Sequence, residues 1–473
     1  MARPTNVAPA EEIGRRVLLL ACLGIAGCLP GAAPTAARSA GLAAPGGAAG
    51  QPEGPARPAG GLAPDQVYAR VAPSVAYVET PLGSGSAVLV EPGLLLTNAH
   101  VVWPYDAARV VFADGTERAA VPVVAQDTIA DLAALDLAAA GGPPPGVAPA
   151  TVADGTALAI GTDLYLVGYP AETESFPQPA LTRGILSRLR RWAAIDTTFL
   201  QTDADLAGGQ SGGALVAPDG TVVGFSSMYL GESDFAVAMS APDAVARLKG
   251  ILAGGPRDGP APRPIPLSGG TLVGVATLAA GGDEAAFVLH AAYGDAVDLS
   301  AEGRGYVSLR AIGPFGDIDL DVDDPNGGRT SGTVDILDDG PYFLVVSRDV
   351  PGEVIVRSSA PLVPYADPDD GAVLELGTTA SGLMDYPGDQ DTWRVHLDAG
   401  SSVTLTVDTI NFSPDADLER ANGDDSRLLD ARLAGPLGLT LTAPFTPEVS
   451  GDYLVRIRDA AGIDTGGYFV RVE

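Results

Sequence analysis

Gly208-Gly209-Gln210-Ser211-Gly212-Gly213-Ala214-Leu215 places one serine between two pairs of glycines. Glycine is costly inside a regular strand, so this stretch predicts a tight, exposed turn that presents Ser211. A serine hydroxyl becomes a nucleophile when an imidazole takes its proton and a carboxylate orients that imidazole. A plain glycine-rich loop would fit the same letters, so the interpretation depends on whether the chain also supplies a histidine and an acid.

A histidine and three candidate acids precede this turn. His100 is the only histidine before residue 290, and it follows an apolar run in Leu95-Leu96-Thr97-Asn98-Ala99-His100-Val101-Val102. A lone histidine is more often structural than catalytic, so His100 gains weight only beside Ser211. The acid has to be chosen among Asp127, Asp131 and Asp136.

These segments resemble the chymotrypsin-like serine proteases, and most closely the bacterial high-temperature-requirement proteases. The resemblance covers roughly residues 63–252 and rests on four blocks in the family's order, at 83–87, 97–102, 131–135 and 201–215. It implies a catalytic triad of His100, Asp131 and Ser211, because the family carries its acid in an Asp-Leu-Ala-x-Leu segment. It also implies an oxyanion hole formed by the backbone N–H groups of Gly209 and Ser211.

The same resemblance suggests how a substrate is held. Ser226, Ser227 and Met228 would line the cleft, and their strand would pair with the peptide. Asp205 stands where trypsin carries the acid that selects Lys or Arg, although a solvent-facing loop carboxylate is the simpler interpretation. Gln210 replaces the aspartate that pairs with a new N-terminus in trypsin-type enzymes, so we expect no activation of that kind. No PDZ module is recognisable after the protease segment.

Short β-branched runs separated by glycine and proline predict an all-β chain. We expect a two-barrel chymotrypsin-like domain at 63–252 that ends in a helix over 241–252, followed by a linker at 253–266. Two β-sandwich domains are expected at 267–360 and 361–473, because 282–290 resembles 388–396 and 340–345 resembles 451–455. A third pair, 318–320 and 416–418, extends the repeat. Both copies resemble bacterial pre-peptidase C-terminal domains, which are commonly removed during maturation.

The N-terminus predicts export. Arg15 and Arg16 precede a short apolar run, and Ile25-Ala26-Gly27-Cys28 resembles a bacterial lipobox. We interpret 1–28 as a lipoprotein signal peptide, Cys28 as the lipidation site, and 29–62 as a disordered Ala/Gly/Pro-rich tether. An ordinary cleaved signal is the alternative. The protein is therefore expected in the bacterial cell envelope or outside the cell, with this anchor as its only membrane link.

The net charge of −31 argues against nucleic acid as a partner. No cofactor and no metal ligand are expected. The aspartates at 317, 319, 321, 323 and 324 alternate with apolar residues, which indicates a strand with an acidic outer face, and calcium binding there stays open. The sequence thus predicts a serine endopeptidase acting on proteins or peptides. The rival hypothesis is an envelope binding protein that uses its sandwiches and carries a silent protease scaffold.

Overall fold

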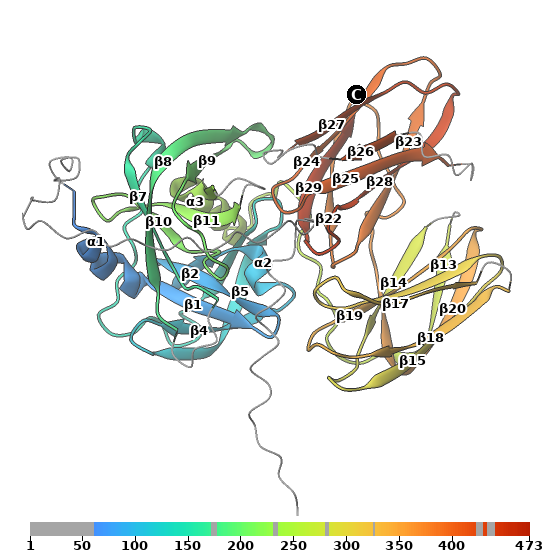
Figure 1. Ribbon diagram of the computed structural model, residues 1–473, viewed down its shortest axis with the longest axis horizontal. Helices are drawn as coiled ribbons and strands as arrows, with labels where there is room; N and C mark the ends of the chain where they lie inside the picture. Colours follow the sequence, from blue (N-terminus) through green and yellow to red (C-terminus); the bar gives the residue numbers. More distant parts are fainter. Residues whose placement is uncertain are drawn as a thin grey trace, which may run out of the picture. The chain divides into compact units, whose positions relative to one another are not determined.

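The computed structural model (Figure 1) describes residues 61–171, 177–229, 235–279, 283–324, 327–421, 429–432 and 440–473. The predicted signal peptide, the lipidation site Cys28 and nearly all of the tether lie outside these residues. In the part of the chain that is described, no helix is both long and apolar enough to cross a membrane. From Leu62 to Glu473 the chain forms a single unit by its internal contacts.

The first barrel closes in the strand order β1-β2-β3-β6-β5-β4. Its first strand is buried on both faces, because Ala76 and Val78 point into the barrel core while Val75 and Tyr77 face the second barrel. The helix α1 (Pro64–Val71) precedes the first barrel, and the short helix α2 (Ala99–Val102) lies between its third and fourth strands. The strands are β1 (Val75–Thr80), β2 (Gly83–Glu91), β3 (Leu94–Thr97), β4 (Ala107–Phe112), β5 (Glu117–Asp127) and β6 (Leu132–Asp136).

The second barrel repeats this arrangement in the order β10-β11-β12-β9-β8-β7. The two barrels share a core in which the rings of Tyr77 and Tyr169 meet edge-to-face, 5.8 Å apart. Two closed six-stranded barrels are the chymotrypsin-like architecture that the sequence predicted. The strands are β7 (Asp163–Gly168), β8 (Ala180–Trp192), β9 (Thr197–Thr202), β10 (Ala214–Val216), β11 (Val222–Tyr229) and β12 (Ala236–Ser240).

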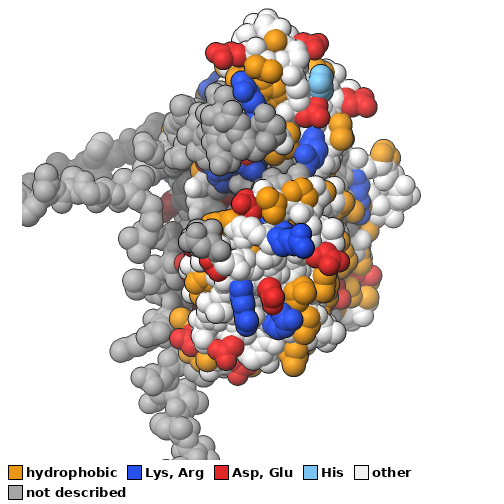
Figure 2. All heavy atoms as spheres, turned by 90° about the vertical axis from the view of Figure 1, so that its right-hand side faces the viewer, with side chains coloured by type: hydrophobic (Ala, Val, Ile, Leu, Met, Phe, Trp, Pro, Cys, Tyr) orange, Lys and Arg blue, Asp and Glu red, His pale blue; other side chains and the backbone are white. Residues whose placement is uncertain are grey.

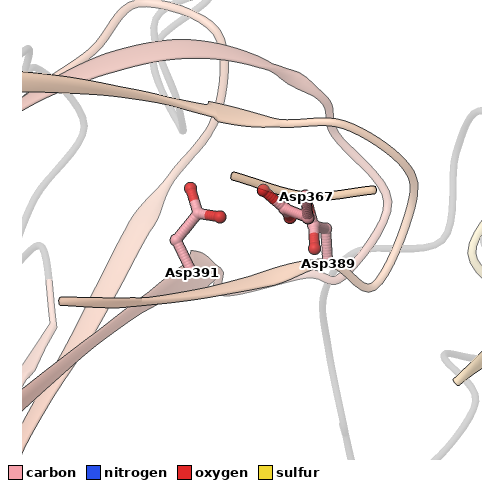
Figure 3. A group of neighbouring side chains, drawn as sticks. All are labelled: Asp367, Asp389 and Asp391. Carbon is pink, nitrogen blue, oxygen red and sulfur yellow. The ribbon is translucent and has the colours of Figure 1, made fainter. Parts of the chain in front are cut away.

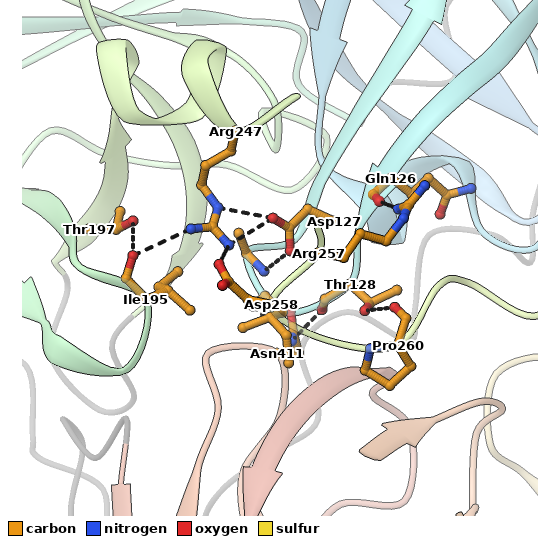
Figure 4. Close-up of polar contacts among 12 residues, drawn as sticks. Gln126, Asp127, Thr128, Ile195, Thr197, Arg247, Arg257, Asp258, Pro260 and Asn411 are labelled. Atoms are coloured by element: carbon orange, nitrogen blue, oxygen red, sulfur yellow. Dashed lines mark hydrogen bonds and ion pairs between the residues drawn. The ribbon is translucent and has the colours of Figure 1, made fainter. Parts of the chain in front are cut away.

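The predicted helix over 241–252 is present as α3 (Ala241–Leu252) and closes the protease domain. Pro242 lies in its first turn, where a missing N–H costs nothing. Arg247 projects from this helix to Asp127 at the end of β5, with Nε 2.9 Å from Oδ2, and also pairs with Asp258 of the linker (Figure 4). Because Asp127 is only 4% exposed, this ion pair fixes α3 against the first barrel.

The first C-terminal repeat forms one hydrogen-bonded sheet of eight strands folded around a single core. Strand β20 joins its parts, since it pairs with β13, β14 and β15. In β17 the aspartates at 319, 321 and 323 are exposed while Leu320 and Val322 pack against the core, as the alternation predicted. Ile318, at the start of the strand, is exposed instead of buried. The strands are β13 (Thr271–Leu278), β14 (Glu284–Leu289), β15 (Ala296–Glu302), β16 (Val307–Ile312), β17 (Ile318–Asp324), β18 (Arg329–Asp335), β19 (Tyr342–Arg348) and β20 (Gly352–Tyr365).

The second repeat, hereafter the C-terminal sandwich, has two sheets around one core that contains Trp393 and Tyr468. One sheet runs β21-β23-β28-β25-β26 and the other β22-β29-β24-β27. The strands are β21 (Ala372–Val373), β22 (Thr379–Met384), β23 (Gln390–Leu397), β24 (Val403–Asp408), β25 (Pro414–Arg420), β26 (Leu429–Arg432), β27 (Thr440–Phe445), β28 (Gly451–Asp459) and β29 (Gly466–Val472).

The repeat seen in the sequence reappears as strand pairing. Leu289 of β14 lies opposite Tyr342 of β19, and the aligned residues Val395 of β23 and Tyr453 of β28 are also opposite each other. The two strand pairs therefore share one register. The third alignment, of 318–320 with 416–418, is wrong, because β25 lies beside β28 whereas β16 separates β17 from β19.

The surface carries mixed charge where it is described. On the face shown in Figure 2, Lys and Arg side chains lie singly or in small groups beside acidic ones. The coloured part of this face therefore offers no continuous basic stripe of the kind that tracks a phosphate backbone.

Candidate active site

His100 lies at the junction of a strand and a short helix. Strand β3 ends at Thr97, and the chain turns at once into α2, which carries His100. Val101 and Val102 are buried and hold this turn of helix against the barrel. The His100 side chain is nevertheless 44% exposed, so a substrate can reach its ring.

Asp131 contacts His100 through both carboxylate oxygens. Oδ2 lies 2.8 Å from Nδ1 of the ring, and Oδ1 accepts the backbone N–H of His100 at 3.0 Å. Asp131 has a φ of 51°, an uncommon conformation that Asp and Asn tolerate better than most residues. The Asn98 amide donates to its carbonyl at 2.8 Å and holds this backbone in place. The strained turn thus aims one carboxylate at one imidazole.

The other two candidate acids serve local structure. Asp127 accepts the backbone N–H of Ala130 at 3.0 Å through Oδ1 and pairs with Arg247 through Oδ2. Asp136, at the end of β6, accepts the N–H of Ala139 at 3.0 Å. Among the three aspartates, Asp131 is the one whose carboxylate meets the imidazole.

The environment of His100 raises the pKa of its ring. Desolvation by the surrounding protein lowers that pKa, but the charge and hydrogen bond of Asp131 outweigh it, and the charge of Asp464 adds to the increase. Desolvation by the surrounding protein, together with the nearby charge of Asp459, raises the pKa of Asp464 to about 6. Because the side chains of both His100 and Asp464 remain accessible, solvent screens their interaction and keeps it modest.

The Ser211 turn requires its glycines. Gly209 and Gly212 have φ values of 86° and 80°, in the region that glycine enters without strain. A Cβ on Gly212 would lie 2.2 Å from the carbonyl oxygen of Ser86, and one on Gly209 would lie 2.4 Å from the backbone nitrogen of Ala171. Both the conformation and the close packing therefore exclude side chains on either side of Ser211.

Hydrogen bonds fix the peptide that carries the N–H of Ser211. Its carbonyl belongs to Gln210, and it accepts from Ser226 Oγ at 2.5 Å and from the N–H of Gly213 at 3.0 Å. In a trans peptide the N–H points opposite to the carbonyl. The Ser211 N–H is therefore directed away from Ser226, and among the described residues no acceptor is found for it.

A second peptide is fixed in the same way. The carbonyl of Gly208 accepts the N–H of Ala171 at 2.5 Å, which directs the N–H of Gly209 to the opposite side. No acceptor among the described residues is found for this N–H either. Two backbone donors are thus held in position with their hydrogens unused, which is the property an oxyanion hole needs.

The buried side chain of Gln210 holds the same loop. Its Oε1 accepts the N–H of Ala207 at 2.7 Å. Gln210, which stands where trypsin-type enzymes carry an aspartate, therefore forms its hydrogen bond within its own turn.

The predicted specificity residues lie in different environments. Asp205 is exposed in the loop after β9, and its carbonyl accepts from Thr182 Oγ1 at 2.7 Å. The hydroxyl of Ser226 is used inside the serine loop. Ser227 is buried, and its hydroxyl has no hydrogen-bond partner in the described part of the chain. Met228 lies on β11, and its side chain is outside the described part of the structure.

The C-terminal sandwich reaches the surroundings of His100. The carbonyl of Thr128, three residues before Asp131, accepts from the Asn411 amide at 2.9 Å (Figure 4). It also accepts from the N–H of Gly467 at 2.9 Å. A pocket beside His100 is lined in part by Asn411 and by residues 465–466. One wall of this pocket therefore comes from a domain more than 250 residues away in sequence.

Three functional neighbours were missed by the sequence analysis. Asn98 and Ser86 lie inside blocks that carry the family resemblance, so a closer look at those blocks would have suggested them. Ser86 bridges the barrels, since its Oγ accepts from the N–H of Tyr169 at 2.8 Å and donates to the carbonyl of Gly209 at 3.0 Å. No sequence pattern pointed to Asp464, because only folding brings this residue near His100.

Residues 85–225 match the family model of the trypsin-like peptidase domain. This segment contains His100, Asp131 and Ser211, together with the two peptides that carry the N–H groups of Gly209 and Ser211. The segment that holds the two barrels and the site is therefore similar to a trypsin-like peptidase domain.

Several bacterial proteases are similar to this segment. The chain is 31% identical over 167 residues to the serine protease Do-like HtrA of Bacillus subtilis, covering 33% of this chain and 36% of that protein. It is 31% identical over 201 residues to the serine protease PepD of Mycobacterium tuberculosis, covering 37% and 41%. A solved HtrA-type protease, AlgW with a tripeptide, aligns at 25% identity over 46% of this chain and 69% of that one, with a TM-score of 0.37. The chain thus spans well under half the length of these two curated relatives.

Proposed function

We propose that the protein is a serine endopeptidase in which Ser211 attacks a peptide carbonyl, His100 takes and returns the proton, and Asp131 orients His100. The observation that carries the proposal is the two-oxygen contact of Asp131 with His100. This contact leaves Nε2 as the ring nitrogen available for proton transfer. The charge that develops on the carbonyl oxygen would be met by the N–H groups of Gly209 and Ser211.

The substrate would bind along β11. This strand pairs with β10 only as far as Phe225, while its pairing with β12 continues to Tyr229. The segment after Ser226 therefore has an edge on which a peptide can add as an extra strand. Ser227 and Met228 belong to this edge, and Asp205 stays a candidate for selecting basic residues. Export with acylation of Cys28 likewise stays a prediction from the sequence.

A fluorophosphonate probe tests the proposal directly, because it reacts with an activated serine. The chain from Leu62 onward should be labelled, the Ser211→Ala variant should not, and Ser331→Ala, which removes an exposed serine on β18, should be labelled like the parent. A folded parent that stays unlabelled beside a reacting control protease would contradict the proposal. That result would favour the rival hypothesis of a binding protein.

The charge of Asp464 should appear in the pH dependence of hydrolysis. Catalysis needs neutral His100, so kcat/KM falls as the pH drops through the pKa of that ring. Asp464 raises the pKa of His100, and Asp464→Asn should therefore move the acid limb of the kcat/KM profile to lower pH. Asp464→Glu keeps the charge and should restore the parental limb. An unchanged limb in Asp464→Asn would show that this carboxylate has no influence on His100.

A further inference from the structure

An acidic cluster lies in the C-terminal sandwich, and its neighbours Arg263 and Asp385 line the pocket beside His100. Asp367 precedes β21, and Asp389 and Asp391 lie at the start of β23. Each of the three offers a carboxylate oxygen, and these oxygens all lie within 4.8 Å of one another. Figure 3 shows the three side chains converging from two segments, with one oxygen of Asp391 facing Asp367.

Asp391 is buried with half of its carboxylate unused. Its side chain is 0% exposed, and Oδ2 accepts a 2.5 Å hydrogen bond from the Tyr468 hydroxyl. That hydroxyl in turn accepts from Trp393 Nε1 at 2.7 Å, so the orientation of the carboxylate is fixed. Oδ1 has no hydrogen-bond partner among the residues that the structure describes. A buried charged oxygen without a partner is costly, and this one therefore indicates a missing ligand.

The cluster also holds more negative than positive charge. Arg263 of the linker pairs with Asp367 at 2.8 Å, with Asp369 at 2.6 Å and with Asp385. Among the described residues that contact the cluster, Arg263 is the cation. One guanidinium thus faces the five carboxylates of residues 367, 369, 385, 389 and 391.

Size and ligand type select the ion. Calcium takes oxygen ligands at about 2.3–2.6 Å, so two ligands on opposite sides of the ion lie about 4.6–5.2 Å apart. Magnesium, at about 2.0–2.1 Å, would draw them closer and keeps most of its waters. The three carboxylate oxygens lie close enough together to bind one ion. Magnesium is usually held by only one or two carboxylates, so a buried group of three favours calcium.

We propose that Asp367, Asp389 and Asp391 form a calcium site in the C-terminal sandwich, with the unpartnered Oδ1 of Asp391 as a ligand. The bound ion would tie the loop before β21 to the start of β23. Through Asp367 and Arg263, it would also brace the linker that leads from the protease domain. The exposed aspartates of β17 are a different group, because they lie on the outer face of the first repeat.

Calorimetric titration of the EDTA-treated full chain with calcium chloride tests this site. We expect one ion per chain with a Kd below about 1 mM, the range of extracellular calcium modules. Asp391→Asn should weaken binding at least tenfold, whereas Asp321→Asn on β17 should leave it unchanged.

The melting temperature separates loss of the site from loss of the fold. Calcium should raise the melting temperature of the parent and of Asp321→Asn. In calcium-free buffer Asp391→Asn should melt no lower than the parent, since the variant loses a buried repulsion, and calcium should no longer raise its melting temperature. No binding to the folded parent, or equal binding to Asp391→Asn, would overturn the proposal. Loss of binding in Asp321→Asn alone would assign the site to β17.

Discussion

The double variant His100→Ala/Ser211→Ala should be no less active than either single variant. Each single replacement should lower kcat by a factor on the order of 10⁶, because nucleophile and base act as one unit and removing either disables both. Residual hydrolysis in all three would come from substrate binding and the fixed N–H groups of Gly209 and Ser211. Initial rates on a fluorogenic peptide, with active-site titration of the parent, would measure these factors.

The chain contains its own control for this experiment. His396 on β23 contacts Asp452 through Nδ1 at 2.7 Å, which is nearly the geometry of the His100 pair, but both side chains are mostly exposed and lie on the outside of the C-terminal sandwich. His396→Ala should hydrolyse the peptide at the parental rate. Independent, multiplicative losses in the double variant would instead mean that His100 and Ser211 do not cooperate in one step.

Asp131→Asn should lower kcat/KM by about 10⁴-fold while the protein stays folded. Asparagine tolerates the left-handed conformation observed at φ 51° and matches aspartate in shape, so the turn should survive. The amide, however, carries no charge to stabilise a protonated His100, and it can present its NH₂ group to Nδ1 and favour the wrong tautomer. The expected loss of kcat/KM in Asp131→Asn therefore has an electrostatic cause and does not require the protein to unfold.

Melting temperature and fluorophosphonate labelling should accompany the rate measurement. Asp131→Asn should melt close to the parent and label slowly. Asp452→Asn, the matched change in the exposed pair, should leave both rate and labelling unchanged. A fully active Asp131→Asn would return Asp127 and Asp136 to consideration as the acid.

Short-range patterns predicted the all-β chain and the helix α3, whereas the two barrels and the pairing of Asp131 with His100 were predicted from the family resemblance. Alternating apolar residues specify which face of a strand is buried, and the glycines around Ser211 specify a turn that no other residue fits. The repeat was visible because Gly282–His290 and Gly388–His396 keep one register in their strands. The β17 alignment failed because similar acidic-apolar alternation occurs on neighbouring strands.

The remaining features depend on contacts between distant segments. Asp464 comes near His100 only after the C-terminal sandwich has docked, and the acidic cluster draws on the linker, a loop and a strand. In the sequence, Asp389 and Asp391 look like ordinary turn residues. Only burial, together with the unpartnered oxygen of Asp391, distinguishes them from the exposed aspartates of β17.

The two hydrogen bonds that Thr128 accepts from Asn411 and Gly467 would be lost if the C-terminal sandwich were removed during maturation. If trimming removed the C-terminal sandwich, the Thr128 carbonyl would lose both donors, and the pocket beside His100 would lose the wall formed by residues 465–466. The charge of Asp464 would leave at the same time. Removal of the C-terminal sandwich would thus lower the pKa of His100 and open the pocket beside it to larger substrates. The long and short forms would therefore differ in catalytic properties as well as in size.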